Sequence, residues 1–99
     1  MDTVKLILGS QSYITGQTPD LVLVSLRPAT GAPALLVTLE ISDSILFQKI
    51  LGAAEQRSLK IQVRGKELTT ELATRSSSLN PSFRGRIVLR QCSPMREVK

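Results

Sequence analysis

The sequence predicts an α+β fold: a small, mostly antiparallel β-sheet, or an OB-like β-barrel, with a single α-helix. Most apolar runs are short and rich in Val, Ile and Leu, which is typical of strands. One stretch alone, residues 42–56, spaces its apolar residues as a helix does. The predicted order is three strands, the helix and three strands. Closure into a barrel would remove exposed strand edges, and the oligonucleotide/oligosaccharide-binding barrel also has its helix between the third and fourth strands.

Length and composition predict one folded domain. The chain has 99 residues, of which 41% are hydrophobic, enough for one modest core. We expect residues 1–92 to be compact and 93–99, which are charged and contain Pro94, to fray. No stretch has the roughly 18 apolar residues of a membrane span, and the start lacks the basic leader and long apolar core of a signal peptide. The sequence therefore predicts a cytoplasmic protein.

The first strand is predicted at residues 3–8, where apolar residues alternate with other types. Residues 9–20 are rich in Gly, Ser, Thr and Pro, which predicts a loop. A short extended piece at 12–15 is the one regular feature that we expect within this loop.

A hairpin is predicted at residues 21–41. Its strands are 21–27 and 34–41, and its loop, 28–33, begins and ends with proline, which cannot donate to a strand ladder. Both strands are apolar at nearly every central position, as in strands covered on both faces. Because one short helix leaves part of this surface uncovered, we expect a homodimer through residues 21–41.

The helix is predicted to begin at Ser42 or Asp43, whose side chain can accept hydrogen bonds from the free N–H groups of the first turn. Five apolar residues then share one face at helical spacing. They are Leu46, Phe47, Ile50, Leu51 and Ala54.

A second hairpin is predicted at residues 58–72, with Gly65 and Lys66 as a two-residue turn. This turn would place opposite charges together on one face and apolar residues together on the other, which defines a register. The four predicted pairs are Arg64–Glu67, Lys60–Glu71, Val63–Leu68 and Leu59–Leu72.

The last strand is predicted at residues 83–91, after a polar connector at 73–82. Because side chains alternate between the faces of a strand, this strand would have a basic side and an apolar side. The basic side holds Arg84, Arg86 and Arg90 together with Val88, and the apolar side holds Ile87 and Leu89.

Charge is distributed unevenly along the chain. The net charge is +5; residues 1–56 have three basic and five acidic side chains, whereas 57–99 have ten basic and three acidic. Such asymmetry predicts an anionic partner. The arginines of the last strand have no acidic partner in that strand, so we expect an unpaired basic stripe. The predicted binding residues are Arg84, Arg86, Arg90, Phe83, Lys60 and Arg64.

Two kinds of partner fit this stripe. The favoured hypothesis is a self-associating protein-interaction module that docks an acidic protein on its basic strand face. The alternative is binding of single-stranded DNA or RNA without sequence specificity, for which arginine suits phosphate. Such binders stack bases on aromatic side chains, and the chain has only three aromatic residues. Phe83, which is next to Arg84, is the best candidate.

Catalysis is not expected. The chain has no histidine and one cysteine, Cys92, so the commonest general base and a set of zinc ligands are both missing. It also has no glycine-rich phosphate-binding motif. Glu40, between a strand and the helix, is the one carboxylate that we consider for acid–base chemistry. We predict a protein that is not an enzyme and needs no metal or cofactor.

Overall fold

The computed structural model describes residues 2–28 and 34–98. Within them the chain forms one helix and eight strands, four before the helix and four after it. The elements are β1 (Lys5–Leu8), β2 (Gln11–Ile14), β3 (Leu21–Pro28), β4 (Leu35–Ile41), α1 (Ser44–Glu55), β5 (Leu59–Val63), β6 (Lys66–Ser78), β7 (Arg84–Gln91) and β8 (Arg96–Glu97).

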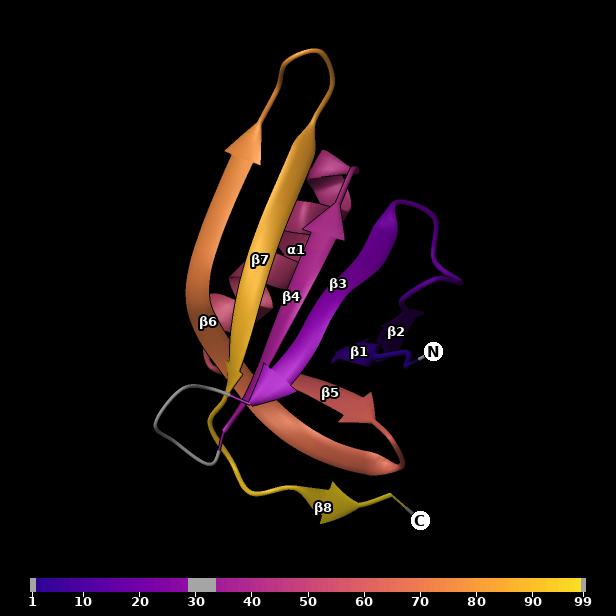
Figure 1. Ribbon diagram of the computed structural model, residues 1–99, viewed down its shortest axis with the longest axis vertical. Helices are drawn as coiled ribbons and strands as arrows, with labels where there is room; N and C mark the ends of the chain where they lie inside the picture. The colour runs from indigo at the N-terminus through magenta and orange to yellow at the C-terminus, as the bar shows by residue number, and fades with distance from the viewer. Residues whose placement is uncertain (1, 29–33, 99) are drawn as a thin grey trace.

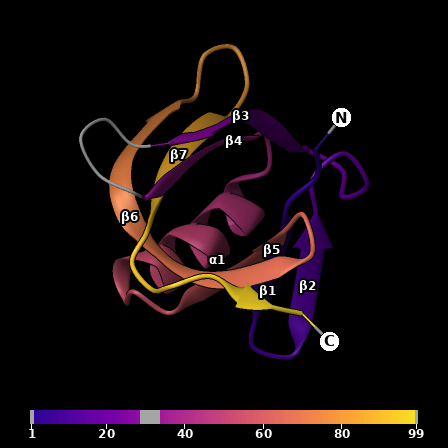
Figure 2. The same cartoon turned by 60° about the horizontal axis from the view of Figure 1, so that its bottom comes forward.

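All described strands belong to one antiparallel sheet in the order β2-β1-β5-β6-β7-β4-β3, with β8 beside β6. The sheet curls around α1 as a half-barrel, so that the helix lies on its concave side (Figures 1 and 2). This confirms the predicted α+β class, the mostly antiparallel sheet and the single helix. In the sheet order, β2 and β3 are the two outermost strands. That this fold is an oligonucleotide/oligosaccharide-binding barrel stays a prediction.

The helix α1 forms as the sequence predicts. The side chain of Asp43 accepts hydrogen bonds from the backbone N–H groups of Ile45 and Leu46, at 2.8 and 3.3 Å. The predicted apolar stripe faces the concave side of the sheet, and all five of its residues are buried. The helix ends shortly before Arg57, whose positive φ of 57° is incompatible with a continuing right-handed helix. Among the residues that the structure describes, no helix combines the length and the apolar character needed to cross a membrane.

The hairpin of β3 and β4 confirms the predicted pairing of these two runs, although residues 29–33 of its predicted loop lie outside the described residues. Only one face of it is covered. Leu21, Val37 and Leu39 are buried in the core, whereas Val22 and Val24 on the opposite face are 55% and 44% exposed. The expectation of two covered faces is therefore wrong for β3 in the single chain.

The hairpin of β5 and β6 forms, but its predicted register is wrong. The turn consists of Arg64 and Gly65, whose φ values of 54° and 75° are both positive, as a type I′ turn requires. Val63 therefore lies opposite Lys66, and Ile61 opposite Leu68. The shift moves each partner by two residues, so every side chain keeps the face that was predicted for it.

The long strand β6 joins the two halves of the sheet. Its first residues pair with β5, and those from Thr70 to Ser78 pair with β7. A bulge between Leu72 and Thr74 bends the strand where it passes from one partner to the other.

The C-terminal segment lies along the same edge of β6 as β7 does. Cys92 donates its backbone N–H to Thr69 at 2.9 Å, and Val98 donates to Gly65 at 3.0 Å. Between these contacts, β8 pairs with the start of β6. The fraying expected for residues 93–99 stays a prediction.

Candidate functional site

The strand β7 has the two faces that the sequence predicts. Gly85, Ile87 and Leu89 are buried, and Arg84, Arg86 and Arg90 are exposed. Gly85 lies directly beneath the Phe47 ring, and the Cβ of any larger residue would collide with it. The core and the arginines therefore lie on opposite sides of one strand, which holds the guanidinium groups outward.

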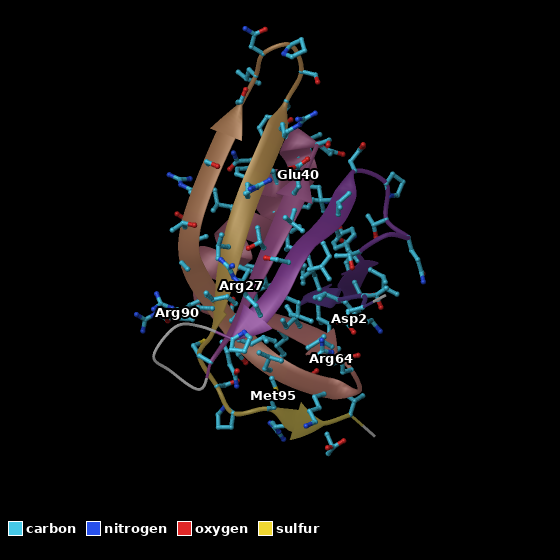
Figure 3. The ribbon with its side chains drawn as sticks, in the orientation of Figure 1. Asp2, Arg27, Glu40, Arg64, Arg90 and Met95 are labelled. Atoms are coloured by element: carbon cyan, nitrogen blue, oxygen red, sulfur yellow. The ribbon has the colours of Figure 1, made fainter. Side chains whose placement is uncertain are left out.

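We call the outward side of β7 and its neighbours the arginine face. It includes the outward residues of β7 and the two glutamates that adjoin them. These residues are Glu40, Glu71, Arg84, Arg86, Val88 and Arg90. Figure 3 shows Glu40 toward one end of this face and Arg90 toward the other.

Glu40 contacts two of the arginines. Pairing of β4 with β7 places it directly opposite Arg86, which donates from Nη2 to its Oε2 at 3.1 Å. The Nε atom of Arg84 lies 3.8 Å from Oε1 of the same carboxylate. The expectation that these arginines are unpaired is therefore wrong, because their partner comes from a strand that is distant in sequence.

Glu71 forms a second cluster at the other end of the face. Its carboxylate oxygens lie 3.3 Å from Nε of Arg57 and 3.8 Å from Nε of Arg90. Arg57, just beyond the helix, is a contributor that the sequence reasoning missed. Lys60, the predicted partner of Glu71, lies opposite Thr69 instead.

The two clusters leave an excess of positive charge. Four arginines share two glutamates, so that the clusters together carry a net charge of +2. All four arginine side chains are at least half exposed. Exposed ion pairs contribute little free energy, so these guanidinium groups can exchange partners easily.

Arg64, also predicted as a binding residue, does not extend the arginine face. Arg64 donates two hydrogen bonds to Asp2, at 2.6 and 3.1 Å, and this pair lies apart from Glu40 and Arg90 (Figure 3). The hydrogen bond from Arg64 is the main reason that the pKa of the Asp2 carboxyl is lowered, and the pKa of Arg64 is raised in turn.

The aromatic side chains are placed away from the arginine face. Phe83, the predicted stacking residue, packs against the core with its ring edge-on to Phe47, the centroids 5.3 Å apart. Tyr13 also packs against the core and donates its hydroxyl hydrogen to Gln11 at 2.9 Å. None of the three aromatic residues is placed to stack a base beside the arginines.

A cleft lies at the Glu40 end of the face. It is formed by the last residues of β6 and the first residues of β7, with Glu40 at its side. The lining residues are Glu40, Ser76, Ser77, Ser78, Arg84, Gly85 and Arg86. Sequence reasoning treated these serines as a connector; their place beside the arginines depends on the pairing of β6 with β7.

The outer edge of β3 is the second exposed feature. Among the described residues no strand pairs with it, and an apolar groove runs beside Val22–Leu26. A bulge at Val24 and Pro28 at the strand end interrupt this edge, and both are features that hinder addition of a further strand.

Groups for catalysis are few. Desolvation and the nearby Glu71 carboxylate raise the pKa of the Cys92 thiol, which disfavours the reactive thiolate. Within the described ranges 2–28 and 34–98, no cluster of acidic or cysteine side chains is arranged to hold a metal ion.

Comparisons of this chain with protein-family models, with curated proteins and with solved structures found no match.

Proposed function

We propose that this protein is a non-catalytic, cytoplasmic protein-interaction module that docks an acidic partner on the arginine face. The observation that carries the proposal is an excess of arginine: three guanidinium groups on the outward side of β7 and that of Arg57 share two carboxylates. An acidic protein surface offers carboxylates that can take the place of the shared glutamates.

The mixed character of the face favours a protein as the partner. Val88 lies between Arg86 and Arg90 on the outward side and is half-buried. Leu36, also half-buried, lies opposite Arg90. Arginine beside small apolar areas is typical of protein interfaces. A single-stranded nucleic acid is the alternative ligand, and it would have to bind this face without aromatic stacking.

The test measures binding of a fluorescent polyglutamate peptide and of a single-stranded oligonucleotide at two salt concentrations. We expect Arg84→Gln/Arg86→Gln to weaken peptide binding about tenfold or more, because two charge-assisted hydrogen bonds are lost. The matched control, Lys49→Gln/Lys66→Gln, removes the same charge from exposed residues elsewhere. Equal loss in both variants, or a preference for the oligonucleotide, would contradict the proposal.

Self-association through the 21–41 hairpin is a second proposal, supported by the exposed Val22 and Val24. Because the edge of β3 is interrupted, we expect contact through these side chains rather than through an extended ladder. Sedimentation velocity would show a dimer that Val22→Thr/Val24→Thr converts to a monomer. A wild-type protein that stays monomeric at high concentration would contradict it.

A further inference from the structure

The cleft beside Glu40 contains an anion that belongs to the protein itself. The Glu40 carboxylate contacts Arg84 and Arg86, at 3.8 and 3.1 Å. Its side chain is 29% exposed, whereas those of the two arginines are 71% and 51% exposed. Glu40 therefore lies deeper than the guanidinium groups, which can turn outward to a ligand without moving the backbone.

Serine hydroxyl groups complete the cleft. Ser78 lies opposite Arg84, and Ser76 lies opposite Arg86, so that the outward side of β6 places a hydroxyl next to each guanidinium group. Together these side chains offer several hydrogen-bond donors around one small volume. The arginines and Glu40 give the cleft a net charge of +1.

The internal carboxylate decides which anion the cleft can take. An aspartate or glutamate of a partner brings the same single charge as Glu40, and Glu40 competes with it from within the same molecule. A phosphoryl group on serine or threonine carries about −1.5 to −2 charges and three acceptor oxygens. Its third oxygen leaves an acceptor for the serines while the other two engage both arginines, whereas the two oxygens of the Glu40 carboxylate are already used on the arginines.

We propose that this cleft is a phosphoryl-binding subsite for a phosphorylated serine or threonine of the acidic partner, and that competition from Glu40 weakens the binding of unphosphorylated acidic segments there. The proposal rests on the proposed function, since it specifies the partner of the same face. Arg84 and Arg86 bind the phosphoryl oxygens, Ser76 and Ser78 donate further hydrogen bonds, and Glu40 turns away to solvent.

The test compares three fluorescent peptides that share one acidic sequence and differ at one position, which is phosphoserine, aspartate or serine. Fluorescence anisotropy should show that the wild-type protein prefers the phosphoserine peptide over the aspartate peptide by about tenfold, as a doubled charge and an additional charge-assisted hydrogen bond predict. Arg84→Gln/Arg86→Gln should remove this preference.

Glu40→Gln tests the internal competitor. We expect it to raise the affinity for the phosphoserine and aspartate peptides by about two- to fivefold, the range that a partly exposed ion pair supplies. Glu71→Gln removes the same charge from the same face but outside the cleft, and it should raise these affinities less. Thermal melting of each variant checks that the fold is kept.

The outcomes separate this inference from the proposed function. If all three peptides bind equally and Arg84→Gln/Arg86→Gln weakens them all, the acidic-partner function stands and the phosphoryl subsite is wrong. If no peptide binds at low salt, both are wrong. An oligonucleotide that binds more tightly than the phosphoserine peptide, or inorganic phosphate that displaces this peptide far better than sulfate does, would assign the cleft to another ligand.

Discussion

The two sides of β7 contribute differently to the stability of the fold. On the concave side, Ile87 and Leu89 are fully buried against α1 and the rest of the core. On the convex side, Arg84, Arg86 and Arg90 remain exposed and share carboxylates from other strands. Burial of apolar area stabilises the fold strongly, whereas exposed ion pairs contribute little. The concave side therefore holds the fold together and leaves the convex side free to change partners.

The largest expected effect compares adjacent residues on opposite sides of β7. Ile87→Ala should lower the free energy of unfolding by about 2–5 kcal/mol, because it leaves a cavity in the core. Val88→Ala, on the half-buried convex side, should cost less than about 1 kcal/mol. Urea denaturation measures both. Equal losses would mean that the convex side is also part of the core.

The next effect concerns the close approach of α1 to the sheet. Gly85→Ala should cost about 1–3 kcal/mol, because the added methyl group collides with the Phe47 ring. Phe47→Leu should cost stability by itself but relieve part of this collision. A double-mutant cycle by urea denaturation should therefore give a clear coupling energy between the two positions. Additive losses would show that the ring moves aside freely.

A smaller effect is expected for Glu40→Gln. Although this substitution breaks contacts with two arginines, it should change the free energy of unfolding by less than about 1 kcal/mol, since all three side chains are partly exposed. A loss as large as that of Ile87→Ala would make Glu40 a structural residue and would remove the contrast between the two sides of β7.

The smallest effect is a pH dependence outside the arginine face. Because Arg64 lowers the pKa of the Asp2 carboxyl below its ordinary value of 3.8, the ionised pair stabilises the folded state above that pH, and this contribution is lost as the pH falls through the folded pKa. Asp2→Asn should therefore show a slightly shallower loss of stability in acid than the wild-type protein. Identical acid titrations followed by circular dichroism would contradict a stabilising role of this pair.

The candidate site could be predicted in part. Alternation in residues 83–91 correctly placed the arginines outside and Ile87 and Leu89 inside. It did not show that Glu40, which is 46 positions from Arg86, would pair with the arginines, and it missed the serines of the cleft. Phe83 was considered for stacking because it is next to Arg84, but the structure has it packed against Phe47. These contacts depend on which strands become neighbours in the sheet. The residue pattern of a single strand does not specify its neighbours.

The sequence by itself determined which side of each strand and of the helix is apolar, because the spacing of two or 3.6 residues is a local property of the backbone. It also determined that residues 58–72 fold back, since a glycine lies between two alternating runs. The tertiary structure decided the sheet order, the turn at Arg64 and Gly65, the pairing of β8 and the partners of every arginine on the convex side. The physical reason is that burial constrains one face of each strand strongly, whereas exposed charges pair weakly with whichever acids the sheet places beside them.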